Sequence, residues 1–158
     1  MQRRVRDEQY RALAEFRHLM RSFLRGSDTD ARKAGLTPQR YQLLLAIRGL
    51  ATGEEATVQT LADRLLLRHH SVVELIDRLE KNGYVRRSRS LEDRRRAIVS
   101  LLPRGERALG RVARQRVREL HSMGAALVKA LNALLGIKGS RRAARKSAIQ
   151  RARREKRA

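Results

Sequence analysis

The fold of this chain is decided by residues 61–105, which read LADRLLLRHHSVVELIDRLEKNGYVRRSRSLEDRRRAIVSLLPRG. Apolar residues at i, i+3, i+4 and i+7 predict an amphipathic helix over about 69–82. Asn82 and Gly83 end this helix with a pair that favours the left-handed conformation after a helix C-terminus. The apolar stripe consists of Val72, Leu75, Ile76 and Leu79.

A β-hairpin is expected directly after this helix. Residues 84–89 and 96–102 are short runs with strand character, and in the second run apolar side chains recur at alternate positions. The loop between the runs is strongly charged. Pro103 stops the second strand and opens another helix. The hairpin is thus predicted to present a basic tip, which reads Glu92-Asp93-Arg94-Arg95-Arg96.

Two helices are expected before the stripe. Thr57 can cap a helix over 58–66, and a short turn through Leu67 and Arg68 separates it from the next helix. Upstream, Thr37 can cap a helix whose first residue is Pro38, the position that proline favours. The order helix, turn, helix, hairpin is typical of a winged helix-turn-helix.

Further amphipathic helices flank this segment. Residues 5–25 show helical spacing, and the run Gly-Ser-Asp-Thr-Asp at 26–30 is expected to break it. After the hairpin, a helix is expected over 103–122, with a bend at Gly124 and a second apolar stripe over 127–135. The winged-helix core leaves these stripes without a partner, so a second copy of the chain is expected to cover them.

Charge indicates the kind of partner. The chain has 158 residues and a formal net charge of +22. Residues 137–158 hold ten basic residues and one acidic residue, so this tail carries +9 and the rest of the chain carries +13. The usual partners of such a basic protein are nucleic acid phosphates or an anionic membrane surface. We expect the tail to be disordered.

Several functional classes lack support in the sequence. There is no cysteine, which excludes a disulfide scaffold, a Cys-ligated zinc site and a thiol sensor. No apolar run approaches the length of a bilayer span. Histidine, aspartate and glutamate show no metal-ligand spacing, and no glycine-rich loop has a nucleotide-binding form. We therefore expect no enzyme, no metal and no cofactor, and an intracellular protein.

The helix over 69–82 has the features of a DNA-recognition helix. Its stripe must face the core, which leaves a polar set outward, and a recognition helix presents its N-terminal residues to base edges. Glu74 is expected to pair with Arg78 at i+4 instead of facing phosphates. For this helix alone, a solvated amphipathic face is the better interpretation; its place beside a basic hairpin favours DNA. The expected DNA contacts are His69, His70, Ser71, Val73, Arg78 and Lys81.

The hairpin tip strengthens this interpretation. An arginine inserted in a narrow minor groove gains from the concentrated negative potential there. A nearby aspartate can hold the guanidinium in place by a bidentate pair. Asp93 and Arg95 suit these two roles, and Arg94 and Arg96 would contact phosphates. The alternative is a solvated charged turn, which does not explain why an acid precedes three successive arginines.

At this point the chain resembles the winged-helix regulators of the MarR family. The resemblance covers residues 36–105 and rests on several short motifs. Three positions depart from the common pattern: Leu66 stands where a small residue is usual, Arg68 where Ser or Asp is usual, and Leu102 where Thr is usual. The matching motifs are Leu61-Ala62-Asp63-Arg64-Leu65, Val72, Leu75-Ile76-Asp77-Arg78-Leu79-Glu80, Gly83-Tyr84-Val85-Arg86-Arg87, Asp93-Arg94-Arg95, Val99-Ser100-Leu101 and Gly105.

The resemblance implies a mainly α fold with a small β-hairpin wing, and N- and C-terminal helices that interlock in a homodimer. It implies a domain over 1–136, with a DNA-binding lobe at about 55–102 and dimerisation helices at about 5–25 and 103–136. It also implies that Arg95 is the minor-groove residue at the wing tip and Asp93 its orienting partner. Members of the family often bind small anionic or aromatic molecules between the dimer region and the lobes. The candidates here are Phe16, Arg17, His18, Arg40 and Tyr41. An equally good interpretation is that the aromatic residues among them pack in the core and the charged ones are solvated.

Two functions follow from these observations. The first is a dimeric regulator, more readily a repressor, that binds a palindrome in double-stranded DNA and responds to a small effector in the cytoplasm, on the nucleoid. The second is a sequence-independent nucleic acid binder, driven by the tail and the net charge. A membrane-surface role ranks last, because the helices lack interfacial tryptophan.

Overall fold

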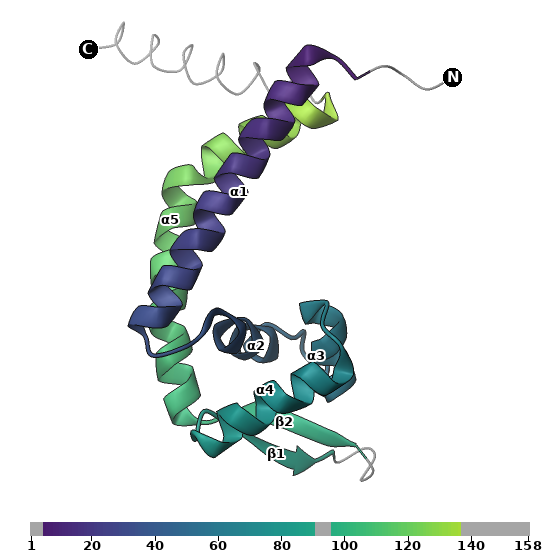
Figure 1. Cartoon of the computed structure of the whole chain (residues 1–158), viewed down its shortest axis with the longest axis vertical. Coiled ribbons are helices and arrows are strands. Elements are labelled where there is room, and N and C mark those ends of the chain that lie inside the picture. Colours follow the sequence, from purple (N-terminus) through teal and green to yellow (C-terminus); the bar gives the residue numbers. More distant parts are fainter. Residues whose placement is uncertain (1–4, 91–95, 137–158) are drawn as a thin grey trace, which may run out of the picture. The chain divides into compact units, whose positions relative to one another are not determined.

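The structure, a computed structural model, describes residues 5–90 and 96–136. These residues belong to two units, which we describe separately (Figure 1). The lobe is Leu24–Arg118. The arm is the part of α1 before residue 24 together with the part of α5 after residue 118. The wing tip at 91–95 and the tail at 137–158 lie outside the described residues.

Helix α1 spans Asp7–Lys33, so the expected break at 26–30 is wrong. The Thr29 hydroxyl donates to the carbonyl of Arg25 within the helix, at 3.0 Å. Ala31 is fully buried in the lobe core, and the carboxylate of Asp30 pairs with the buried Arg116. These tertiary contacts outweigh the weak helix propensity of the Gly-Ser-Asp-Thr-Asp run.

The next two helices begin at the predicted caps. Helix α2 spans Pro38–Arg48, and the Thr37 hydroxyl accepts from the backbone N–H of Arg40 at 3.3 Å. Helix α3 spans Val58–Leu65, and the Thr57 hydroxyl accepts from the N–H of Thr60 at 3.1 Å. Each cap satisfies a backbone donor that the helix itself leaves unpaired.

Helix α4, His69–Lys81, follows the predicted stripe. Val72, Ile76 and Leu79 are fully buried, and Leu75 packs partly buried against the same core. Gly83 has a φ of +69°, as expected for the residue that ends this helix. The polar side of α4 consequently faces solvent.

The wing is an antiparallel pair of strands, β1 (Val85–Arg89) and β2 (Ala97–Leu101), within one residue of the predicted bounds. Val85 pairs with Leu101 and Arg89 with Ala97. Beyond β2, Thr57 forms an isolated bridge with Ile98. The predicted fold class, mainly α with a small hairpin in a winged helix-turn-helix, is confirmed.

Helix α5 spans Pro103–Leu135 and continues through Gly124, so the expected end near residue 122 is wrong. A single glycine costs a helix interior only about 1 kcal/mol, which a long helix tolerates. No helix in the described part of the chain has the length and apolarity of a membrane span.

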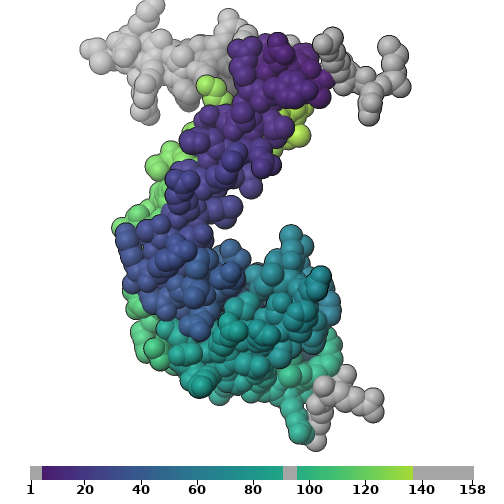
Figure 2. Space-filling model, in the orientation of Figure 1, coloured from purple at the N-terminus to yellow at the C-terminus, as the bar shows by residue number. Residues whose placement is uncertain are grey.

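The core of the lobe is mostly aliphatic, and the end of α1, helices α2 to α5 and both strands contribute to it. In the space-filling view the blue and teal residues of the lobe form one contiguous body (Figure 2). Ala108 and Val112 of α5 belong to this core, which ties the start of α5 to the lobe. Its fully buried apolar side chains include Leu43, Leu44, Leu61, Val72, Ile76, Leu79 and Val85.

Candidate nucleic-acid interface

The polar face of α4 carries the residues that the sequence nominated for base contact. His69 and His70 in the first turn are exposed, and Ser71 and Val73 are half-buried at the edge of the face. Arg78 and Lys81 are exposed farther along, in the last turn. The six candidates therefore lie on one helix, with histidine and serine donors at its N-terminus and two cations at its C-terminal end.

Arg78 already has a partner. Its Nη2 donates to the Glu74 carboxylate at 3.2 Å, so the predicted i, i+4 pair is confirmed. Both side chains are well exposed, and such surface pairs contribute little to stability. The pair partly neutralises the Glu74 carboxylate and leaves four of the five N–H groups of Arg78 for other acceptors.

The turn before α4 shows the consequences of two unusual residues. Leu66 is the C-cap of α3 with φ +54°, and its side chain is 92% exposed. Leucine occupies this left-handed conformation at a cost that glycine avoids. Arg68 is the N-cap of α4 and makes no side-chain capping hydrogen bond. The entry to α4 therefore has no side-chain cap and follows a residue in a left-handed backbone conformation.

Arg87 of β1 clamps α4 onto the wing. Its guanidinium lies 2.7 Å from Glu80 Oε2 and 2.5 Å from Asp77 Oδ1, and it donates to the carbonyl of Val73 at 3.4 Å. Its backbone N–H donates to Glu80 Oε1 at 2.7 Å. Sequence reasoning missed this clamp, although two acids three apart on a helix before a basic strand are a usable signal.

The clamp shifts the titration of its members. The backbone N–H of Arg87 and then its guanidinium, against some desolvation, lower the pKa of Glu80. Burial tends to lower the pKa of Arg87, but its hydrogen bonds to Asp77 and Glu80 outweigh burial and raise it. The ion pairs are therefore fully formed at neutral pH.

Arg104 at the start of α5 makes a second clamp. Its Nη1 donates to the carbonyl of Asn82 at 2.8 Å, and its guanidinium lies 4.6 Å from the centre of the Tyr84 ring. A cation at the C-terminal end of α4 also interacts favourably with the helix dipole. The two clamps hold α4, β1 and the start of α5 as one piece.

At the wing root, Glu55 contacts both stems of the hairpin. The Ser90 hydroxyl donates to Glu55 Oε1 at 2.5 Å, and Arg96 Nη1 lies 3.8 Å from Glu55 Oε2. Arg96 is exposed. The other three nominated wing residues, Asp93, Arg94 and Arg95, lie outside the described residues. Nothing in the sequence signalled the link between Glu55 and Ser90, which are 35 residues apart.

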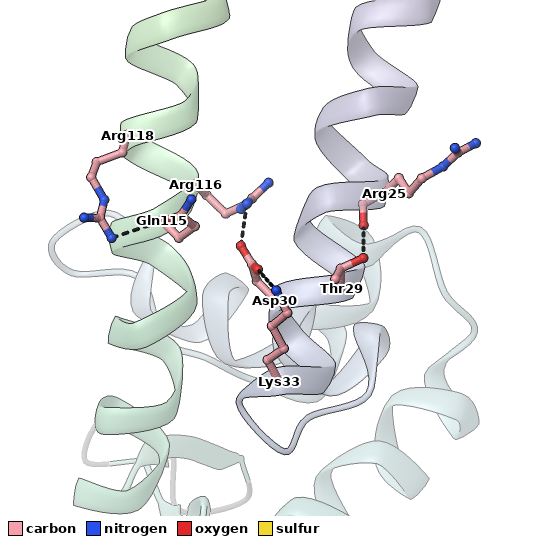
Figure 3. A network of polar contacts seen from close by, with 7 residues as sticks. All are labelled: Arg25, Thr29, Asp30, Lys33, Gln115, Arg116 and Arg118. Carbon is pink, nitrogen blue, oxygen red and sulfur yellow. Dashed lines mark hydrogen bonds and ion pairs between the residues drawn. The ribbon is translucent and has the colours of Figure 1, made fainter.

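A polar network with a largely buried ion pair at its centre joins α1 and α5 within the lobe (Figure 3). Arg116 is almost fully buried and pairs with Asp30, which also lies 3.9 Å from Lys33 Nζ. On the same helix, Arg118 donates to Gln115 at 2.9 Å. Breaking a buried pair by removing one partner leaves an uncompensated charge, so Asp30 and Arg116 depend on each other.

The nominated effector residues divide between the two units. Phe16, Arg17 and His18 lie on the arm part of α1, whereas Arg40 and Tyr41 lie on α2 in the lobe. Tyr41 is buried in the lobe core, and burial raises the pKa of its hydroxyl, with Arg116 lowering it and Asp30 raising it further. Among the described residues, His, Asp and Glu form no group of three that could hold a metal.

Residues 34–96 match the model of the MarR family. The chain is 35% identical over 71 residues to the HTH-type transcriptional regulator SarZ of Staphylococcus saprophyticus, a match that covers 45% of this chain and 47% of SarZ. It is also 35% identical over 88 residues to the uncharacterized HTH-type transcriptional regulator YsmB of Bacillus subtilis, covering 56% and 58% of the two chains. The chain thus spans about half the length of these relatives.

Solved structures show the same fold over more of the chain. AbsC of Streptomyces coelicolor, a MarR family transcriptional regulator, has a TM-score of 0.65 and 21% identity over 92% of this chain and 99% of its own. An S. aureus MepR variant bound to an oligodeoxyribonucleotide has a TM-score of 0.56 and 16% identity, covering 89% and 93%.

A third structure is CouR of Rhodococcus jostii RHA1 bound to p-coumaroyl-CoA. It has a TM-score of 0.59 and 22% identity, covering 75% of this chain and 84% of its own. At these identities the likeness is one of fold. Together with the sequence match, it shows that the winged-helix segment of this chain, residues 34–96, is similar to that of MarR family regulators.

Proposed function

We propose that this protein is a dimeric, sequence-specific DNA-binding regulator of transcription. The observation that carries the proposal is the exposed polar face of α4, held by Arg87 and Arg104 beside a hairpin whose tip is rich in arginine. A rigid helix of this kind fits a major groove, and a wing fits the neighbouring minor groove.

The residues divide into three roles. His69, His70 and Ser71 at the N-terminus of α4 would donate to base edges, and Val73 would contact a thymine methyl group. Arg78 and Lys81 would bind phosphates, as would Arg94 and Arg96. Arg95 would enter the minor groove, oriented by Asp93.

The relatives support the same function. SarZ and YsmB carry the description of transcriptional regulators, and the MepR variant was solved on an oligodeoxyribonucleotide. The proposal extends these properties to this chain because its lobe contains the segment that matches them. A regulator of this kind would act on the nucleoid, in the cytoplasm.

The arm supports the dimer. Large apolar side chains on both of its helices are exposed in the single chain, and a second copy would cover them. A two-fold dimer would place two α4 helices on a palindromic site. The exposed apolar residues of α1 in the arm are Tyr10, Leu13 and Met20, and those of α5 are Leu120, Val128, Leu131 and Leu135.

We further propose repression by occupancy of a promoter, relieved by a small aromatic or anionic effector. CouR supports the effector class, because it was solved with an aromatic acyl-CoA. Phe16, Arg17 and His18 of the arm, and Arg40 and Tyr41 of the lobe, stay the candidates for contact with such an effector. An effector that favours one spacing of the two lobes would change the affinity for DNA.

Selection of duplexes from a random pool tests the proposal. The protein should enrich an imperfect palindrome and bind it more tightly than a scrambled duplex. Arg95→Ala should weaken the selected site by roughly 1–3 kcal/mol, the usual value of a good groove contact. Arg32→Ala, which removes an equal charge from an exposed site on α1, should have a much smaller effect. Equal weakening by both variants would contradict the wing assignment.

The net charge of +22 favours a second candidate, a sequence-independent nucleic acid binder. This candidate predicts equal affinity for selected and scrambled duplexes. Both functions can use the tail, whose +9 charge would add non-specific affinity. The logarithm of the affinity for duplex DNA falls with the logarithm of the salt concentration, with a slope of about −0.9 per phosphate contacted. Deleting 137–158 should therefore make this slope shallower. An unchanged slope would dismiss a role for the tail in DNA binding.

A further inference from the structure

The wing root is held by a glutamate from the loop between α2 and α3. We propose that Glu55 is the positioning residue of the wing: it fixes both stems of the hairpin to the segment that starts the helix-turn-helix. The inference rests on the proposed function, since it assigns a role in DNA reading to a residue that would not touch DNA.

The first support is the pair of contacts on the stems. Ser90 Oγ donates to Glu55 Oε1 at 2.5 Å, and the Arg96 guanidinium lies 3.8 Å from Glu55 Oε2. Ser90 and Arg96 themselves face each other, because the Ser90 N–H donates to the Arg96 carbonyl at 2.9 Å. One carboxylate therefore contacts the residue after β1 and the residue before β2.

The second support is the backbone on either side of the contact. The Ala56 carbonyl accepts from the N–H of Val99 at 2.9 Å, and Thr57 bridges to Ile98. Thr57 is also the N-cap of α3. Ala56 and Thr57 thus join β2 of the wing to the start of α3 through one backbone hydrogen bond and one isolated bridge.

The third support is electrostatic. Ser90 is only 1% exposed, and Glu55 Oε2 is buried with no hydrogen-bond donor among the described residues. A buried carboxylate oxygen without a hydrogen-bond donor is stabilised by a nearby cation, and the Arg96 guanidinium, 3.8 Å away, supplies one. The neighbouring Glu54 is different: it accepts from Ala51 N and Arg64 Nη2, and is not bonded to the described part of the wing.

A wing held at its root loses less freedom when it binds. When an arginine at a hairpin tip enters the minor groove, the favourable binding free energy is reduced by the entropic cost of ordering the hairpin. Releasing the stems from Glu55 should therefore weaken specific binding. It should not weaken binding that depends on charge alone, because removal of a carboxylate makes the lobe more basic.

Glu55→Gln separates these effects, and Glu54→Gln is its matched control. Both variants remove one negative charge from adjacent positions, and in Glu55→Gln the new amide oxygen would still accept from Ser90. Each is measured by fluorescence anisotropy against the selected duplex and a scrambled duplex. For Glu55→Gln we expect the ratio of the two affinities to fall about three- to tenfold, as for partial loss of a groove contact. For Glu54→Gln both affinities should rise together and the ratio should hold.

Ser90→Ala keeps the inference testable if Glu55→Gln unfolds, because it removes the hydrogen bond without a change in charge. It should lower affinity for the selected duplex and leave the scrambled duplex unchanged. Glu55→Gln and Ser90→Ala variants that keep the parent's ratio would overturn the inference while the proposed function stands. A parent that binds both duplexes equally would overturn the proposed function and this inference with it.

Discussion

The lobe and the arm place the same kind of side chain in opposite environments. In the lobe, leucines such as Leu43 and Leu61 are fully buried. In the arm, Leu13 and Leu131 are exposed, although each lies on an amphipathic helix. The lobe therefore closes a core within one chain, whereas both helices of the arm expose large apolar side chains. The family match, residues 34–96, lies entirely within the unit that is complete by itself.

Substitutions of two glycines of α5, one in the lobe and one in the arm, should show the largest difference between the two units. A Cβ at Gly105 would lie 2.3 Å from the backbone oxygen of Tyr84, whereas a Cβ at Gly124 meets nothing within 4 Å. Gly105→Ala should therefore cost about 3 kcal/mol or more in urea unfolding, because backbone must move. Gly124→Ala should raise stability by roughly 0.5–1 kcal/mol, the helix propensity difference.

Either glycine variant can break the comparison. A neutral Gly105→Ala would mean that the close contact between α5 and the wing is soft. A destabilising Gly124→Ala would sharpen the comparison instead, because a second copy would then occupy the space beside Gly124 that is open in the single chain.

The arm face should respond to a buried charge. Leu131→Asp should raise the dimer dissociation constant at least about tenfold, because an unpaired carboxylate in an apolar interface is poorly tolerated. Analytical ultracentrifugation measures the change. Leu66→Asp is the control, since Leu66 is even more exposed but belongs to the lobe. If Leu66→Asp dissociates the dimer and Leu131→Asp does not, the interface lies on the lobe.

Acid should loosen the lobe through its clamp. In the folded state the pKa of Glu80 lies below its usual value of 4.5. The ionised carboxylate therefore stabilises the fold fully above pH 4.5, and this stabilisation is lost as the pH falls through the lowered pKa. Hydrogen exchange should show α4 and β1 losing protection over that acid range. Glu80→Gln should flatten this dependence; an unaltered acid response in the variant would show that other carboxylates govern it.

The sequence was a reliable guide where the physics is local. The caps at Thr37 and Thr57 and the end of α4 at Gly83 depend on residues within one turn, and each was confirmed. The helix through residues 26–30 was missed because its support comes from Arg116, 86 residues away from Asp30.

The candidate site divides in the same way. Periodicity identified the polar face of α4, since the buried stripe leaves only one side for solvent. It gave no information on what holds that face in place. The contacts of Arg87 and of Glu55 join segments that meet only after the chain has folded. The two acids on α4 before a basic strand are a signal for the Arg87 contact, whereas no sequence pattern pairs Glu55 with Ser90.

The smallest expected effect concerns Leu66, the most exposed of the large apolar residues that the structure describes in the lobe. Leu66 is more exposed than any described apolar residue of the arm, yet its position follows from a left-handed backbone and not from an uncovered helix face. Leu66→Gly should therefore raise the stability of the lobe by roughly 0.5–1 kcal/mol, because it removes backbone strain and no buried surface. Leu67→Gly, at a position without positive φ and with a more covered side chain, should lower stability by a similar amount. If Leu66→Gly instead lowers stability, and does so only at protein concentrations where the dimer forms, that result would place Leu66 in a dimer interface, as proposed for the exposed apolar residues of the arm.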